Sequence, residues 1–198
     1  MISACMIVQD EEVCVSRALD SIHDYVDEVI IVDGGSADRT RDIVLQYSKV
    51  RLFDIPFQMD FALQYNNAIE RATGEWILMI DADEYYPKYT CENLIILTLV
   101  EPEADAFSFP TKTFVDGKLL NPHYPDPHIR YFRNYCRYAG KFHSSLIGFK
   151  KLIPSNLDLF HDKTAQQQWD SNFLYWDMGQ APQPGWQKID GKWVNTNI

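Results

Sequence analysis

The feature that most limits how this chain folds is a short apolar run that ends in three carboxylates, Glu75-Trp76-Ile77-Leu78-Met79-Ile80-Asp81-Ala82-Asp83-Glu84. The part from Trp76 to Asp81 is too short for an independent helix and has the length of a buried strand. Open α/β sheets bind ligands at the carboxyl ends of their strands, so we expect the acids to face a crevice. Asp81 and Asp83 lie two residues apart and would point to the same side of an extended chain.

This pair of acids indicates a metal site. Asp81 and Asp83 offer the hard oxygen ligands that Mg²⁺ or Mn²⁺ prefers. The simpler interpretation is an acidic turn that ends a strand and caps the next helix, because short acidic motifs also occur for that reason. The motif by itself leaves both interpretations open.

The residues before this run alternate between strand and helix patterns. Strands are predicted at residues 2–8, 28–33 and 50–55, and helices at about 12–25, 40–47 and 61–72. The strand at 28–33 is rich in β-branched residues without alternation, which is typical of a parallel strand covered on both faces. Gly74 is expected to stand just past the end of the third helix. Four such units predict an α/β fold with a doubly wound, mostly parallel sheet.

Beyond Pro87 the pattern changes. A helix near 92–100 is followed by strand-like stretches at 106–115 and 128–133, which predict an antiparallel or mixed extension of the same sheet. From Ala165 the chain is rich in Gln, Asn, Pro, Gly and Trp. A docking helix is expected around Trp169 to Trp176, and a short hairpin or a flexible tail from Trp186 onwards.

Composition narrows the class of protein. A chain of 198 residues with 46% hydrophobic residues can bury one core, and a net charge of −10 argues against nucleic acid as a partner. Four scattered cysteines without a C-x-x-C pair suggest neither a zinc site nor a disulfide framework, which favours a reducing compartment. No basic-flanked leader is visible, and the longest later apolar run, Leu94 to Val100, is too short to cross a bilayer. We therefore expect a cytoplasmic protein.

Positive charge is concentrated in one stretch of this acidic chain. Between Pro110 and Lys151, eight bases face two acids, Asp116 and Asp126. Such a stretch predicts contact with a phosphate-bearing ligand or with the inner face of a membrane, as a peripheral protein. A solvated face is the alternative.

Three blocks of the sequence resemble a known family. Residues 3–12, 27–40 and 72–84 look like successive blocks of a family 2 glycosyltransferase with the GT-A fold, and weaker similarity follows at 128–133 and 140–143. The resemblance implies a nucleotide-sugar-binding half at 1–90. It implies an acceptor-side half of the same domain at 91–164, followed by a C-terminal helix and tail at 165–198.

The same resemblance implies how the donor is held. Glu11 and Asp33 would hold the base and the ribose, with backbone contacts from Val8 and Gln9. A helix N-terminal acid is the alternative role for Glu11, and a turn-forming residue is the alternative for Asp33.

The resemblance also assigns the metal and diphosphate residues. Asp81 and Asp83 match the D-x-D motif that holds Mn²⁺ or Mg²⁺ on the diphosphate, and Asp81 would also touch the ribose. Arg130 would grip the diphosphate, because Arg130 and Arg133 are three apart on a strand and cannot both face the site. His143 and His161 are further candidate metal contacts, although buried, hydrogen-bonded histidines are common.

The base for the acceptor hydroxyl is less clear. Related sequences often carry His-Glu where this chain has His143-Ser144. Asp126, between two prolines, is the remaining acid nearest the expected cleft, with a structural turn as the alternative.

The implied reaction is transfer of a sugar from a nucleotide-diphosphate sugar, expected to be UDP-linked, to a hydroxyl of a sugar or lipid-linked glycan. We expect inversion and a role in cell-surface glycan or lipopolysaccharide-type synthesis. A catalytically inactive nucleotide-sugar-binding or scaffold protein of the same fold is the main alternative. Phosphatase and nicotinamide-dependent patterns are not matched by Gln9-Asp10-Glu11 or Gly34-Gly35-Ser36.

Overall fold

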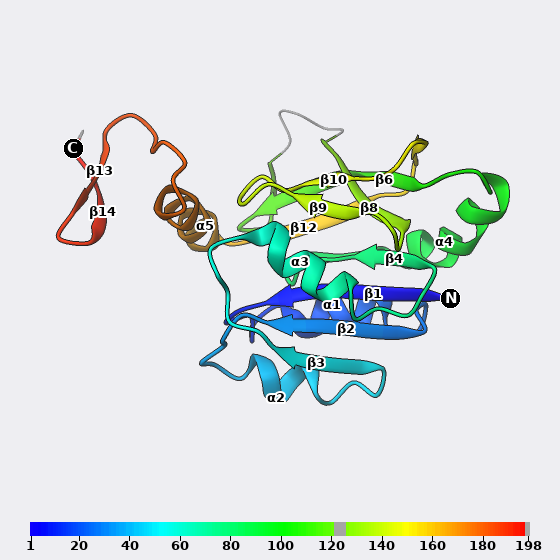
Figure 1. Ribbon diagram of the computed structural model, residues 1–198. Coiled ribbons are helices and arrows are strands. Elements are labelled where there is room, and N and C mark those ends of the chain that lie inside the picture. The colour runs from blue at the N-terminus through cyan, green and yellow to red at the C-terminus, as the bar shows by residue number, and fades with distance from the viewer. Residues whose placement is uncertain (121–125, 197–198) are drawn as a thin grey trace.

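One large sheet dominates the computed structural model, which describes residues 1–120 and 126–196 (Figure 1). Within those residues the sheet has ten strands, and its main path runs β3-β2-β1-β4-β8-β6-β12-β5. The parallel half contains β1 (Ile2–Val8), β2 (Glu28–Asp33), β3 (Val50–Asp54) and β4 (Trp76–Met79). The other half contains β5 (Glu84–Tyr85), β6 (Ala106–Val115), β7 (Lys118–Leu119), β8 (Asp126–Arg133), β11 (Leu152–Pro154) and β12 (Leu159–Lys163).

The predicted α/β class and the mixed extension are both confirmed. β8 runs antiparallel to β4 and to β6, so the parallel half passes into a mixed half at β4. In the parallel half, Val8 lies opposite Asp33 in the register of β1 and β2. The carboxyl ends of these strands therefore meet at one edge, where the acids that follow β4 also lie.

Five helices are described, and each of them differs at one or both ends from the predicted range. They are α1 (Val15–Ile22), α2 (Thr40–Val44), α3 (Phe61–Ile69), α4 (Lys88–Val100) and α5 (Ala165–Asp177). α1 begins later than predicted, and the preceding backbone is instead held by hydrogen bonds from Glu11 N–H to Thr40, the first residue of α2, and from Glu12 N–H to Asp38. α4 begins earlier than predicted, directly after Pro87, whose fixed φ of −56° suits a helix start. No helix in the described part of the chain is both long and apolar enough to span a bilayer.

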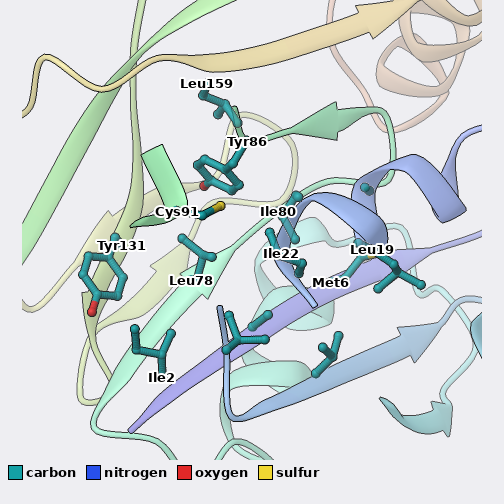
Figure 2. Close-up of a cluster of buried hydrophobic side chains, with 14 of the residues drawn as sticks. Ile2, Met6, Leu19, Ile22, Leu78, Ile80, Tyr86, Cys91, Tyr131 and Leu159 are labelled. Atoms are coloured by element: carbon teal, nitrogen blue, oxygen red, sulfur yellow. The ribbon is translucent and has the colours of Figure 1, made fainter. Parts of the chain in front are cut away.

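The helices cover both faces of the sheet, as a doubly wound fold requires. On one face, α1, α2 and α4 pack on alternate residues of β1, β2 and β4; Figure 2 shows part of this cluster, including Met6, Leu19 and Leu78. On the other face, α3 and the hairpin of β9 (Arg137–Ala139) and β10 (Ser145–Ile147) pack on the remaining positions. Burial on both faces explains why β2 is apolar without alternation.

Gly74 has a different role from the predicted one. α3 ends at Ile69, and Gly74 is not among the glycines with positive φ. A Cβ atom at Gly74 would lie 2.6 Å from Ser3 Oγ and 2.7 Å from Ser3 N. The glycine is therefore needed for close approach to β1 and not for a helix C-cap.

The C-terminal residues form a separate small unit, which confirms the hairpin alternative. α5 packs against an antiparallel hairpin of β13 (Trp186–Ile189) and β14 (Lys192–Asn195). Trp169, Phe173 and Trp176 recur at helical spacing and contact Trp186, with ring centroids 5.0 to 5.6 Å apart. In Figure 1, α5 lies beyond the carboxyl ends of β1 and β2, and the hairpin lies farther out.

Candidate active site

Two loops interlock at the carboxyl edge of the parallel strands. Asp10 adopts a left-handed conformation with φ 58°, and its Oδ1 accepts a hydrogen bond of 2.7 Å from Ala37 N. In return, the Asp10 N–H donates to Ser36 Oγ over 3.0 Å. These contacts fix the positions of Glu11 and Asp33 relative to each other.

Asp33 ends β2 and is completely buried. Its carboxylate accepts hydrogen bonds from Ser36 N at 3.1 Å and from Ser36 Oγ at 2.5 Å, and Arg41 Nη1 lies 3.4 Å away. The turn-forming role is therefore present in the structure. A carboxylate has about four acceptor sites, so a ribose contact stays compatible with this geometry as a prediction.

Val8 and Gln9 lie beside the turn that follows β2. The Val8 carbonyl accepts a hydrogen bond of 2.8 Å from Gly34 N, and a Cβ atom at Gly34 would lie 3.1 Å from Gln9 Oε1. The backbone of the two loops thus packs closely where the resemblance implies the nucleoside.

Glu11 lies with the acids that follow β4. Burial raises the pKa of Glu11 to about 7; the Cys14 thiol, which donates to Oε2 over 3.0 Å, opposes this, and the charges of Asp83 and Asp81 raise it further. α1 begins at Val15 and has no acid in its first turn, so the helix N-terminal role is not observed for Glu11, and its role in nucleotide binding stays a prediction.

Asp81 is held from two sides. Its Oδ1 accepts a hydrogen bond of 2.9 Å from the Tyr65 hydroxyl, and its Oδ2 accepts one of 2.5 Å from Arg130 Nη2. Burial raises the pKa of Asp81, and the charge of Arg130 opposes that rise. Tyr65 lies on α3 and was not predicted as a site residue. Its spacing in the sequence indicated only that it belongs to the apolar face of a helix.

Arg130 links Asp81 to Glu84. Its Nη2 also donates a hydrogen bond of 2.6 Å to Glu84 Oε1, and Glu84 Oε2 accepts a hydrogen bond of 3.0 Å from Asp81 N. Burial alone would raise the pKa of Glu84, but the charge of Arg130 and further hydrogen bonds bring it to about 2. Arg130 was predicted to grip a diphosphate, whereas here its Nη2 binds these two carboxylates. As predicted, Arg133 points elsewhere, over the ring of Trp76 at 4.1 Å.

Asp83 contacts His161. The distance between His161 Nε2 and Asp83 Oδ2 is 2.8 Å, and the Asp162 N–H donates to the Asp83 carbonyl over 2.9 Å. Burial lowers the pKa of His161, but the hydrogen bond and the charge of Asp83 raise it above its usual value. The contact depends on β12, which pairs with β5 so that His161 lies opposite Glu84.

The other two predicted residues lie at the margin of this cluster. Asp126 is exposed at the start of β8, 3.4 Å from His128 Nε2. Pro125, which was expected to hold it, lies outside the described residues. His143 is exposed, and its Nε2 lies 3.0 Å from Gln180 Oε1 and its ring 5.3 Å from that of Tyr175.

The donor groups fit a divalent cation only in part. Across residues 1–120 and 126–196, no group of three or more His, Cys, Asp or Glu side chains is arranged to hold a metal. Asp83 Oδ2 and His161 Nε2 are nevertheless 2.8 Å apart, and a cation that replaced the proton between them would gain one oxygen and one nitrogen ligand. Mg²⁺ and Mn²⁺ sites often use one or two protein ligands and complete the shell with substrate phosphates and water, so this pair suits such a shared site.

Half of the eight bases between Pro110 and Lys151 are buried or paired with acids of the described residues. Arg130 is buried, Lys112 pairs with Asp158, Arg133 with Glu75 and Lys151 with Glu101. At these four positions, acids from other parts of the chain balance the positive charge that is concentrated in the sequence. An open cleft of about 620 Å³ lies at the opposite end of β4, beside Glu75 and Asp105. Asp81 and Asp83 do not line it.

A family model described as glycosyl transferase family 2 matches residues 3–152. The chain belongs to glycosyl transferase family 2. One of its curated relatives is the SPbeta prophage-derived glycosyltransferase SunS of Bacillus subtilis, 29% identical over 168 residues. The match covers 81% of this chain and 39% of SunS, so the chain spans well under half the length of that relative.

Two solved structures share the fold of this chain. Residues 1–349 of TarS from S. aureus, in complex with UDP, match with a TM-score of 0.66 and 15% identity, over 89% of this chain and 64% of that one. Glucosyl-3-phosphoglycerate synthase from Mycobacterium tuberculosis, in complex with Mn²⁺, UDP and glucosyl-3-phosphoglycerate, matches with a TM-score of 0.62 and 15% identity, over 98% and 86%. The expected GT-A fold is thereby confirmed.

Proposed function

We propose that this chain transfers a sugar from a UDP-linked donor to a hydroxyl acceptor, with Mn²⁺ or Mg²⁺ held by Asp83 and His161. The observation that carries the proposal is the 2.8 Å contact of these two side chains at the carboxyl edge of the sheet, next to Asp81 and Glu11. Family membership supports the reaction class. The UDP and Mn²⁺ in the structures of similar proteins support the donor and the metal.

The residues around Asp81 suit the chemistry of glycosyl transfer. When the bond between the anomeric carbon and the diphosphate breaks, negative charge grows on the leaving phosphate. A divalent cation, when bound, supplies Lewis-acid stabilisation of that charge. Tyr65 and Arg130 fix the orientation of the Asp81 carboxylate, so that its position does not have to be established during the reaction.

We further propose Asp126 as the base that takes the proton of the acceptor hydroxyl, with inversion at the anomeric carbon. Asp126 is exposed, and its Oδ2 lies 3.4 Å from His128 Nε2. Ser144, which stands where related sequences often have Glu, donates a 2.6 Å hydrogen bond to the Gly140 carbonyl and offers no carboxylate. For the acceptor we propose a sugar or a lipid-linked glycan of the cell surface.

Ser144 also favours the second candidate function, a nucleotide-sugar-binding protein without activity. Release of free sugar from UDP-glucose or UDP-N-acetylglucosamine in the presence of Mn²⁺ separates the two. Turnover that is lost in Asp126→Asn, with unchanged UDP affinity, supports the enzyme. Tight UDP binding with no turnover on either donor, with or without acceptors, supports the binder.

The metal assignment is tested by calorimetry of UDP binding in Mn²⁺ and in chelator. The parent should bind at least about tenfold more tightly in Mn²⁺, because two carboxylates and a diphosphate repel each other without a cation. Asp83→Ala and His161→Ala should reduce that difference, whereas Asp20→Asn, an exposed change on α1, should not. Equal affinity of the parent in the two buffers would contradict the assignment.

A further inference from the structure

The C-terminal helix returns the chain to the edge of the sheet that carries the acids. α5 follows directly on β12, the strand that supplies His161. Its start is fixed by a capping box of Thr164 and Gln167 and by a 3.2 Å hydrogen bond from Ala165 N to Asp116 Oδ1. In Figure 1, α5 lies off the arrowheads of β1 and β2 and beside the first turn of α3.

One residue of α5 is linked to Asp81 by a row of aromatic rings. The Tyr175 ring lies edge-on to Phe61 with centroids 5.8 Å apart, and Phe61 stacks on Tyr65 at 6.4 Å. Tyr65 in turn donates its hydroxyl to Asp81. The Tyr175 ring also contacts the ring of His143, with centroids 5.3 Å apart, so it packs between two parts of the chain.

The charges of three site residues, Asp81, Asp83 and Arg130, act on the Tyr175 hydroxyl. Burial raises the pKa of Tyr175, the charges of Asp81 and Asp83 raise it further, and Arg130 opposes them. The two acids that follow β4 therefore contribute to the electrostatic environment of the phenol, in agreement with the row of rings that leads to Asp81. The phenol stays protonated at neutral pH and is available as a hydrogen-bond donor.

The Tyr175 hydroxyl has no hydrogen-bond partner among the described residues. The side chain is half-buried, and its hydroxyl is not one of the buried polar atoms without a partner, so it reaches solvent. The outer contacts of α5 do not involve this hydroxyl, because Trp169, Phe173 and Trp176 make them. A phenol that is accessible at this edge can donate a hydrogen bond to a ligand.

We propose that Tyr175 binds the donor beyond its α-phosphate: its hydroxyl donates a hydrogen bond to the β-phosphate or to the sugar, and the Phe61 and Tyr175 rings form the wall beside it. The inference rests on the proposed function and extends it, because it makes the C-terminal helix part of the donor site. A pyranose presents apolar C–H faces that pack on aromatic rings, and both the phosphate and the sugar hydroxyls offer acceptor oxygens for a phenol.

The test compares a series of ligands that differ only in this part of the donor. Calorimetry in Mn²⁺ measures UMP, UDP and UDP-glucose, with GMP, GDP and GDP-mannose as a parallel series, on the parent, Tyr175→Phe and Tyr175→Ala. Tyr89→Phe is the matched control. Tyr89 lies on α4, and its hydroxyl donates a hydrogen bond of 2.6 Å to Asp158 and not to Asp81 or Asp83. Circular dichroism melts check that the variants fold.

In the series that binds the parent, Tyr175→Phe should leave the monophosphate affinity within twofold and weaken a longer ligand by about five- to tenfold, as expected for one hydrogen bond. A loss that first appears at the diphosphate assigns the hydroxyl to the β-phosphate, and one that first appears at the nucleotide sugar assigns it to the sugar. Equal losses for all three ligands, or none for any, overturn the inference and leave the proposed function intact. A parent that binds neither series overturns both.

Discussion

Glu84 accepts a hydrogen bond of 2.6 Å from Arg130 Nη2 with a side chain that is completely shielded from solvent. The two residues lie on different strands, 46 positions apart, and Asp81 shares the same guanidinium nitrogen. A buried carboxylate of this kind serves the site indirectly. It balances the charge of Arg130, which in turn holds Asp81.

We expect Glu84→Ala to be strongly destabilising. Removing one partner of a buried ion pair leaves the other charge poorly compensated, at a cost of about 3–5 kcal/mol in the free energy of unfolding. Urea denaturation measures this cost. Glu92→Ala, which removes only an exposed pair with Lys88 on α4, should cost less than about 1 kcal/mol. Similar losses for the two variants would show that the Arg130 cluster is not stabilised by Glu84.

Glu11 should make the folded state less stable as pH rises. Burial first, with Asp83 and Asp81 adding to it, raises the folded-state pKa of Glu11 from 4.5 to about 7. The protonated form therefore favours folding: this stabilisation is complete below about pH 4.5 and is lost as pH rises through about 7.

In Glu11→Gln this component disappears. Between pH 5 and pH 8, in chelator, the parent should lose up to about 3 kcal/mol more of its free energy of unfolding than the variant. Urea titrations at the two pH values measure the difference, and the remaining carboxylates act as an internal reference because both proteins share them. Parallel pH profiles of the parent and the variant would show that ionisation of Glu11 does not lower the free energy of unfolding.

Trp176→Ala should loosen the C-terminal unit without unfolding the sheet. Trp176 is 6% exposed and contacts Trp186 and Trp193 of the hairpin, so its loss leaves a cavity that costs about 3–5 kcal/mol locally. Of the 5 tryptophans, only Trp76 lies in the sheet. Tryptophan fluorescence therefore reports mainly on this unit, and far-UV circular dichroism reports on the whole fold. The variant should show an earlier fluorescence transition and a nearly unchanged circular dichroism transition; a common shift of both would mean that the unit and the sheet unfold together.

Gly74→Ala should destabilise the parallel half of the sheet. The added methyl group would lie 2.7 Å from the backbone nitrogen of Ser3, and a backbone atom cannot move aside as a flexible side chain can. Overpacking of this kind costs about 1–3 kcal/mol. Thermal melts of Gly74→Ala and of the double variant Gly74→Ala/Ser3→Gly separate the two contacts. Rescue by the double variant would assign the clash to the Ser3 side chain instead of its backbone.

The parallel half of the fold could be predicted from sequence because its signals are local. An apolar run such as that before Asp81, or the β-branched run before Asp33, can be recognised from a few adjacent residues. The same runs end in the acids Asp33, Asp81 and Asp83, and strand order then requires these acids to meet at one edge. The resemblance of three short blocks extended this to the family, which the match over residues 3–152 confirms.

The partners of the charged residues were decided by tertiary structure. In the sequence, the stretch containing Lys112, Arg133 and Lys151 looks like a basic surface, yet these bases find acids that are 46, 58 and 50 residues away along the chain. Arg130 was expected to face a ligand, but the antiparallel register of β4 and β8 places it beside Asp81 and Glu84. A side chain cannot show from its own neighbours which distant strand will lie beside it.

The same distinction applies to the site. The sequence determined which acids end the strands, because that depends on residues only a few positions apart. The hydrogen bond from Tyr65 to Asp81 joins residues 16 positions apart, and the contact of His161 with Asp83 joins residues 78 positions apart. The row of rings from Tyr175 toward Asp81 spans an even longer separation in the chain. These contacts exist only after strand pairing and helix packing have removed the water between the elements, and so only the folded chain could decide them.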